Sequence, residues 1–140
     1  MMAVVNFDGA TGWLGRRPEL AGRVVLVNFW TLTCINWIRQ APWVRAWAGA
    51  YRDDGLVVVG VHTPEFSVEG NLDNLKAEVK RNGIAYPVAQ DNRYATWQAW
   101  GNQFWPAFYL VDRKGQVVYT HVGEGNYEQT DAAIRKALGL

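Results

Sequence analysis

The sequence has only one cysteine, Cys34, among its 140 residues. A lone thiol cannot form an internal disulfide, so cysteine usage does not fix the cellular compartment. Histidine is also scarce. His62 and His121 have no metal-ligand spacing with each other or with Cys34, so we expect no metal centre. The glycines on either side of Glu124 are too few for a phosphate-binding loop, and the sequence predicts no cofactor.

The chain also lacks an excess of one charge and any long apolar run. Its 14 basic and 13 acidic residues give a net charge of +1, which indicates neither nucleic acid nor an anionic membrane as a partner. No apolar run approaches the roughly 20 residues of a membrane span. Residues 1–8 lack the basic and apolar regions of a signal peptide. We expect a cytoplasmic protein, or an extracytoplasmic one if an export segment has been trimmed from this chain.

The length of the chain fits one domain with a real hydrophobic core. We expect a single domain over residues 1–140, with the turn-rich residues 1–23 as an N-terminal extension packed on the core. Continuous apolar runs indicate buried strands, and apolar spacing of 3–4 residues indicates helices. These patterns predict an α/β fold with a central mixed sheet flanked by helices. The expected strands are 24–30, 56–62, 86–89, 107–111 and 116–122, and the expected helices are 34–52, 72–81, 94–100 and 127–138.

Tryptophan is the residue type that the chain has in excess, with eight copies. Two interpretations stay open. The rings fill the core, or some of them form an aromatic surface that docks a partner or a ligand. In the helix expected over residues 34–52, spacing of 3–4 residues predicts the buried stripe. That stripe is Ile38, Ala41, Val44, Ala48 and Tyr51.

Cys34 lies at the junction between the strand expected over residues 24–30 and the helix that follows. At a helix N-terminus, unpaired backbone N–H groups and the helix dipole favour the thiolate over the thiol. Three residues further, where a CxxC redox motif has its second sulfur, the chain has Trp37. The local sequence therefore has one half of a redox pair.

Several segments resemble a known family in the order in which they occur. The cysteine at the start of a helix, the proline eight residues later and Trp105-Pro106 before a strand resemble the thioredoxin fold. The chain is most similar to its TlpA/ResA/DipZ-type branch, above all the thioredoxin-like domain of DipZ proteins, over about residues 11–139. Members of this branch are thiol-disulfide oxidoreductases, usually extracytoplasmic, so the resemblance implies a protein or low-molecular-weight thiol or disulfide as partner. The matching segments are 27–30, 60–66, 105–110 and 123–125.

The resemblance also implies roles for individual residues. Cys34 matches the attacking cysteine of the family. Pro106 matches the cis-proline whose loop faces that sulfur, and the backbone of Trp105 is expected to hold the substrate chain. Trp30 and Trp37 are expected to form aromatic walls of the substrate-binding site.

Neutral amides occupy the positions where relatives of this kind often have acids. Asn28 stands at the place of a buried aspartate, and Gln40 at the place of a helix glutamate. Glu65, after the second strand, is the nearest candidate acid by topology. His62 is the second candidate for proton transfer, because its ordinary pKa is near neutral. A histidine at a strand end more often satisfies a backbone partner, and that interpretation stays open.

Four functions fit these residues. We favour a thiol-redox protein in which Cys34 forms a mixed disulfide or a sulfenic acid that an external thiol resolves. One alternative is a degenerate, non-enzymatic module that binds a peptide or protein in an aromatic groove. Another is a peroxiredoxin-like thiol peroxidase, suggested only by Thr31, three residues before the cysteine. The last is a buried, inert cysteine. The sequence leaves open whether the chain is an enzyme.

Overall fold

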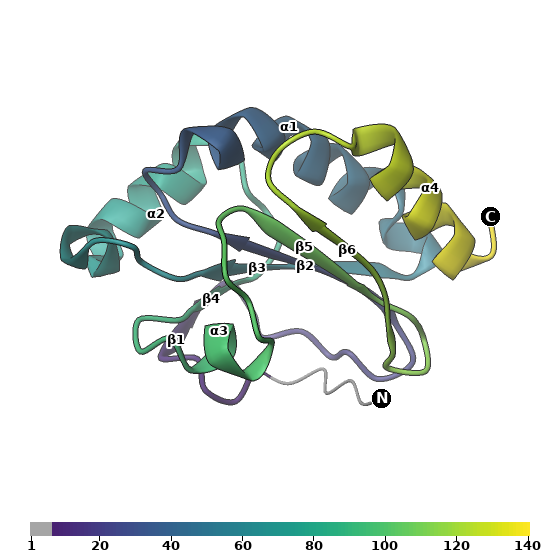
Figure 1. The fold of residues 1–140 in the computed structure, drawn as a ribbon, viewed down its shortest axis with the longest axis horizontal. Coiled ribbons are helices and arrows are strands. Elements are labelled where there is room, and N and C mark those ends of the chain that lie inside the picture. The colour runs from purple at the N-terminus through teal and green to yellow at the C-terminus, as the bar shows by residue number, and fades with distance from the viewer. Residues whose placement is uncertain (1–6) are drawn as a thin grey trace.

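The computed structural model describes residues 7–140, and Figure 1 shows a six-stranded sheet flanked by helices. The strand order is β1-β4-β3-β2-β5-β6. The strands are β1 (Gly12–Leu14), β2 (Val24–Trp30), β3 (Leu56–His62), β4 (Val88–Gln90), β5 (Ala107–Val111) and β6 (Val117–Val122). The helices are α1 (Ile35–Ala50), α2 (Leu72–Arg81), α3 (Ala95–Ala99) and α4 (Tyr127–Leu138), with 3-10 turns η1 (Arg52–Asp54) and η2 (Ser67–Gly70). The predicted α/β fold with a mixed sheet is confirmed.

The central strands bring three distant segments together at one end of the sheet. β2 and β3 run parallel and in register as far as the pair Trp30–His62. β5 runs antiparallel to β2, and Ala107 pairs with Phe29. The carboxyl ends of β2 and β3 therefore lie beside the amino end of β5. The segments that follow Trp30 and His62 meet there with the segment that precedes Ala107.

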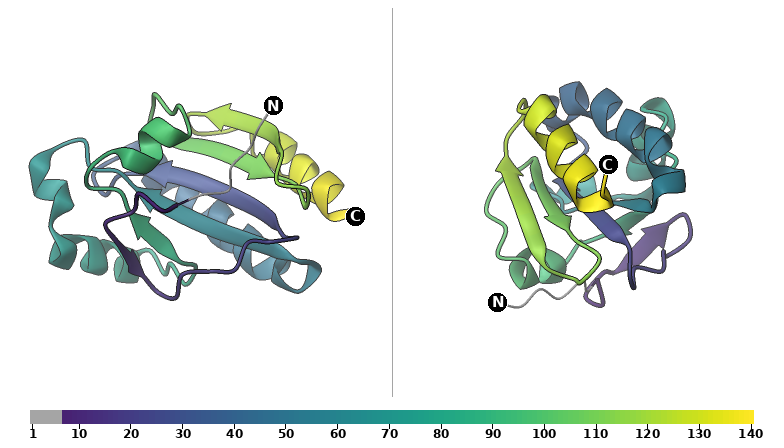
Figure 2. Two further views of the ribbon diagram at one scale, coloured as in Figure 1. Left: turned by 90° about the horizontal axis from the view of Figure 1, so that it is seen from below. Right: turned by 90° about the vertical axis from the view of Figure 1, so that its right-hand side faces the viewer.

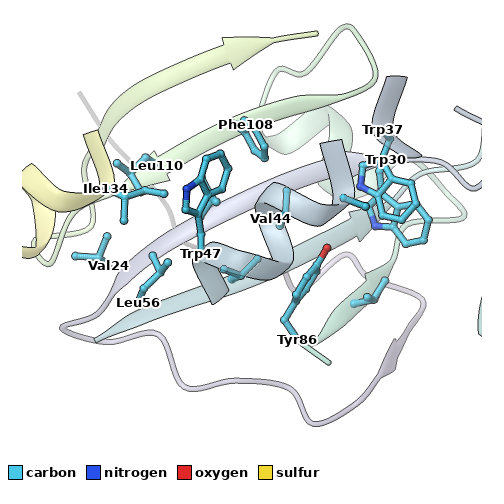
Figure 3. Packing of buried hydrophobic residues seen from close by; sticks show 14 of the residues in the cluster. Val24, Trp30, Trp37, Val44, Trp47, Leu56, Tyr86, Phe108, Leu110 and Ile134 are labelled. Carbon is cyan, nitrogen blue, oxygen red and sulfur yellow. The ribbon is translucent and has the colours of Figure 1, made fainter. Parts of the chain in front are cut away.

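Helices and loops cover both faces of this sheet. Figures 1 and 2 show α1, α2 and α4 on one face, with α3 on the other. One core cluster packs α1 and α4 against β2, β3 and β5, and Figure 3 shows 14 of its residues. The second cluster lies on the opposite face around Phe29 and Phe7. Because both faces are covered, all seven residues of β2 are buried, which explains its continuous apolar sequence. No helix among residues 7–140 has the length and apolarity to cross a membrane.

Most of the tryptophan rings fill the core. Trp43 differs, because it is 48% exposed and stacks on Tyr127 of α4. Trp105 also differs, since it lies partly buried in the loop before β5. The other six rings belong to the two core clusters or pack against them, so core filling is the main role of this residue type. These six are Trp13, Trp30, Trp37, Trp47, Trp97 and Trp100.

The buried face of α1 differs from the expected stripe. Trp37 is 0% exposed, and the buried face is rotated toward it. Burying an indole ring removes far more apolar surface from water than burying an alanine, so the ring decides the orientation of the helix. Ile38, Ala48 and Tyr51 are only partly buried. The buried residues of α1 are Trp37, Gln40, Ala41, Val44 and Trp47.

The segment before β2 contributes a strand that the sequence did not predict. β1 pairs antiparallel with β4, and Trp13 lies opposite Ala89. This pairing covers the outer side of β4 and adds an edge strand to the sheet. Within the N-terminal extension expected over residues 1–23, Phe7 is buried in the second cluster. Residues 1–6 of that extension lie outside the described residues.

Candidate functional site

Cys34 is the N-cap residue of α1 and is partly exposed. Its backbone N–H donates to the carbonyl of Thr31 at 3.0 Å, which closes the turn between β2 and α1. The first turn of α1 contains no acidic residue. The positive end of the helix dipole at the sulfur is therefore not offset within its own turn. A partly exposed thiol in this position can act as a nucleophile.

The loop before β5 lies at the same end of the sheet as Cys34. The peptide bond between Trp105 and Pro106 is cis, and Pro106 is buried. The indole Nε1–H of Trp105 donates to the carbonyl of Thr63 at 2.8 Å, which ties this loop to the one after β3. Among the described residues, none forms a hydrogen bond with the backbone N–H or carbonyl of Trp105. These two backbone groups are available to an extended chain that lies across the loop.

Trp30 and Trp37 lie inside the protein. Both are 0% exposed, and their rings stack with centroids 3.9 Å apart and planes 18° apart. Figure 3 shows the stacked pair at the end of the core cluster. The indole Nε1–H of Trp37 donates to Oδ1 of Asn28 at 2.9 Å. Neither ring reaches the surface, so in this structure the expected aromatic walls are part of the core instead.

The two amides at the expected acid positions hold Trp37 in place. Asn28 accepts from Trp37, and its Nδ2 donates to Oε1 of Gln40 at 3.3 Å. Gln40 in turn donates from Nε2 to the carbonyl of Gly123 at 3.3 Å. The network links β2, α1 and the loop after β6 through neutral groups. These two positions therefore supply hydrogen bonds that orient Trp37, and they supply no titratable acid.

The buried carboxylate near Cys34 belongs to Glu69, which the sequence analysis did not select. Glu69 is 0% exposed. It accepts from the backbone N–H groups of Thr33 at 3.1 Å, Glu65 at 2.9 Å and Phe66 at 2.7 Å, and also from the Thr33 hydroxyl. Burial alone would raise the pKa of Glu69, but the hydrogen bonds from Thr33 and Phe66 outweigh it and lower that pKa.

Glu65 and Glu69 thus have different positions in the structure. The side chain of Glu65 is exposed, and only its backbone N–H takes part in the cluster. Glu69 lies three residues after Phe66 and reaches back to its N–H, as the acid of a capping box does. Because Phe66 has no side-chain acceptor, the sequence lacks the Ser/Thr-x-x-Glu signature of a complete capping box, and no local signal marks Glu69.

His62 lies at the end of β3 and forms a hydrogen bond with the turn before Cys34. It is 0% exposed, and its ring lies edge-on to Trp30 with centroids 4.9 Å apart. Nε2 accepts from the backbone N–H of Leu32 at 3.2 Å, so this hydrogen-bond network assigns the proton to Nδ1. Burial lowers the pKa of His62 to about 4, and the charge of Glu69 opposes that shift in part. The imidazole is therefore neutral at pH 7 and satisfies a backbone donor.

Exposed apolar side chains occur on the segments that meet at the Cys34 end of the sheet. We call Ile35, Phe66, Val68 and Phe104 the apolar rim, and each is more than half exposed. Ile35 follows the cysteine, and Phe104 precedes the cis Trp105–Pro106 bond. Phe66 and Val68 lie in the segment after β3 that contains Glu69. Glu69 joins this segment to the turn before Cys34 by its hydrogen bond with Thr33. Exposed apolar side chains near a partly exposed thiol favour a surface that contacts another molecule.

The described part of the chain contains no group of three or more His, Cys, Asp or Glu side chains that could hold a metal ion. His121 lies on β6, where its ring contacts the carbonyl of Glu124 at 3.4 Å. Glu124 also pairs with Arg39 of α1 at 3.2 Å, between exposed side chains. The chemistry of the site therefore depends on Cys34 and on the groups that fix the turn before it.

Comparison with known proteins agrees with the fold. The family model described as Redoxin matches residues 17–138. Protein DipZ from Mycobacterium bovis is 45% identical over 140 residues, which cover 95% of this chain and 20% of that protein. The chain therefore spans about one fifth of the length of this relative.

Two further comparisons match nearly the whole length of both chains. The thiol-disulfide oxidoreductase YkuV from Bacillus subtilis is 26% identical, over 95% of this chain and 92% of that protein. The crystal structure of a thiol-disulfide isomerase from Corynebacterium glutamicum superposes with a TM-score of 0.86 at 20% identity, over 99% and 97% of the two chains. That structure supports the thioredoxin-like fold alone. The chain belongs to the Redoxin family and, within it, to the TlpA/ResA/DipZ-type thioredoxin-like proteins.

Proposed function

We propose that this chain is a thiol-redox protein that acts through the single nucleophile Cys34. The observation that carries the proposal is the contrast between two positions of α1. Cys34 is partly exposed at the helix N-terminus, whereas Trp37, where a second thiol would stand, is buried and hydrogen-bonded to Asn28. The site therefore presents one sulfur to solvent, and no second thiol of this chain can resolve a mixed disulfide at Cys34.

The reaction is thiol-disulfide exchange with two external participants. The Cys34 thiolate attacks one sulfur of a substrate disulfide, a mixed disulfide forms, and the other substrate sulfur leaves as a thiolate that takes a proton from solvent. An external thiol then attacks the mixed disulfide at the substrate sulfur. That step releases the Cys34 thiolate and leaves a disulfide between the substrate and the external thiol. The electrons balance, because one disulfide is consumed and one is formed.

Protein residues orient this exchange without transferring protons. His62 and Glu69 accept from the backbone N–H groups of Leu32 and Thr33, which fixes the turn directly before Cys34. The backbone of Trp105 is placed to hold an extended substrate chain, and the apolar rim contacts the substrate surface around it. The partner that fits these features is a protein disulfide with apolar flanks, and a low-molecular-weight thiol fits the resolving step.

Thr31 gives the peroxidase alternative little support. Its side chain is 1% exposed, so its hydroxyl does not face a molecule that approaches Cys34 from solvent. In the binding-module alternative, a peptide or protein also contacts the apolar rim. The two functions differ in whether Cys34 reacts with a disulfide. A test of the sulfur therefore separates it from the proposed function.

The test measures how fast Cys34 forms a mixed disulfide with oxidised glutathione, by quenching with acid and intact-mass spectrometry. The urea-unfolded protein is the matched control, because it has the same thiol without the site. We expect the folded protein to react faster than the unfolded protein, and Cys34→Ser to form no adduct. Slower reaction of the folded protein would contradict the proposal, and peptide binding without reaction would favour the non-enzymatic module.

A further inference from the structure

A pocket of about 440 Å³ lies beside the second half of α1, away from Cys34. Its walls come from α1, from the start of β3 and from the segment before β4. Ala48, Leu56, Val58 and Pro87 give it an apolar lining. Figure 3 shows Leu56 and Tyr86, two of the lining residues, below α1. The volume lies within the range of about 300–1,000 Å³ that is typical of small-molecule sites.

The pocket is separate from the redox site. Leu56 opens β3 and pairs with Val24 at the amino end of β2, whereas Cys34 follows the carboxyl end of β2 at Trp30. At roughly 3.3 Å per residue, the length of β2 places the two ends about 20 Å apart. A molecule in the pocket therefore leaves Cys34 and the apolar rim open.

Every charged residue that lines the pocket is an arginine. Arg23, Arg45 and Arg52 contribute to the lining, and among residues 7–140 no aspartate or glutamate does. Arg45 donates from Nη1 to the carbonyl of Asn82 at 2.6 Å, which holds its guanidinium between α1 and the segment before β4. The guanidinium of Arg52 forms a long ion pair of 3.9 Å with the exposed Asp53. A guanidinium has five N–H donors, so these side chains retain donors for an anion.

We propose that this pocket binds a small organic anion with an apolar body and one carboxylate. The apolar lining takes the body, and the guanidinium groups of Arg45 and Arg52 take the carboxylate, since arginine pairs with carboxylates in a two-pronged geometry. Arg23, the third arginine of the lining, adds positive charge. Charge complementarity selects an anion over a neutral molecule of the same shape.

The test follows backbone amide signals of the ¹⁵N-labelled protein by NMR during titration with octanoate. We expect the largest shifts at Ala48, Gly49, Val57 and Ala85, and little change around Cys34. 1-Octanol has the same chain without the charge and is the matched probe. Octanoate is expected to bind at least about tenfold more tightly than octanol, and added salt should weaken octanoate binding. Equal affinities for the two probes would overturn the proposal.

Two variants test which arginines bind the carboxylate of octanoate. Arg45→Gln combined with Arg52→Gln should weaken octanoate binding at least about tenfold, because both carboxylate partners are removed. Arg93→Gln removes an exposed arginine in the turn before α3, outside the pocket, and should leave the affinity unchanged. Unchanged binding in the double variant, with its fold verified by circular dichroism, would refute the site. Cys34→Ser should bind octanoate as the parent protein does, so this test is independent of the proposed redox function.

Discussion

Trp37 occupies the position of a second thiol, so replacing it with cysteine tests whether this position is structural. Its buried ring stacks on Trp30 at 3.9 Å between centroids and donates to Asn28 at 2.9 Å. Removing such a ring costs about 3–5 kcal/mol, and the unpaired Asn28 oxygen adds about 1–3 kcal/mol. We expect Trp37→Cys to lower the free energy of unfolding by about 4–8 kcal/mol, a large part of the about 5–15 kcal/mol of a typical domain.

Urea unfolding under reducing conditions, followed by far-UV circular dichroism, measures this loss. Trp37→Phe is the matched control, because it keeps an aromatic ring against Trp30 while it removes the indole N–H and the smaller ring of the indole. Its expected cost is about 1–3 kcal/mol. A loss below about 2 kcal/mol in Trp37→Cys would refute the argument that the ring and its hydrogen bond hold this part of the core. The expected result means that adding a second sulfur does not by itself create a stable dithiol site.

Three further predictions concern the buried groups around the turn before Cys34. The pKa of His62 is lowered from 6.5 to about 4, so the unfolded chain binds more protons between these values and acid favours unfolding. Unfolding free energies measured by urea at several pH values should fall by about 3 kcal/mol from pH 6.5 to below pH 4 on this account, and a profile that rises toward acid would contradict it. Glu69→Gln should cost about 2–3 kcal/mol in the same assay, because an amide cannot accept all the hydrogen bonds that the carboxylate accepts. The exposed Glu65→Gln should change stability by less than about 0.5 kcal/mol, and equal losses in the two variants would contradict the assignment of Glu69. In Gly60→Ala, the new Cβ would lie 3.0 Å from Nε1 of Trp30, so thermal unfolding should show a loss of about 1–3 kcal/mol, whereas an unchanged midpoint would mean that the ring has room to move.

The regular part of the fold was predictable because its patterns are local. Continuous apolar runs identified β2 and β3 with their observed bounds, and α2 and α4 also begin and end as expected. β1 has only three residues among turn-forming ones, so it has no pattern of its own and forms by pairing with β4. A strand that depends on a partner so distant in sequence is not visible in a local window.

The site was predictable in position and less so in its supporting groups. The sequence predicts Cys34 at the start of a helix, the family resemblance implies a cis bond at Pro106, and the structure has both features. The motif position of Trp37 predicts a surface role, whereas its helical spacing with Ala41 and Val44 predicts the buried face that the structure shows. Glu69 was missed because its role depends on contacts with Thr33, 36 residues away.

The pairing of β2 with β5 has a consequence for the order in which the chain folds. Asn28 reaches the carbonyl of Ala107 across 79 residues of sequence. Contacts between residues so far apart in sequence are expected to form late in folding, because closing the long loop between them costs conformational entropy. A nascent chain that has emerged only as far as β4 therefore has the thiol of Cys34 without the loop that selects what approaches it. The loop proposed to hold the substrate therefore joins the Cys34 turn only after the chain has been synthesised past β5.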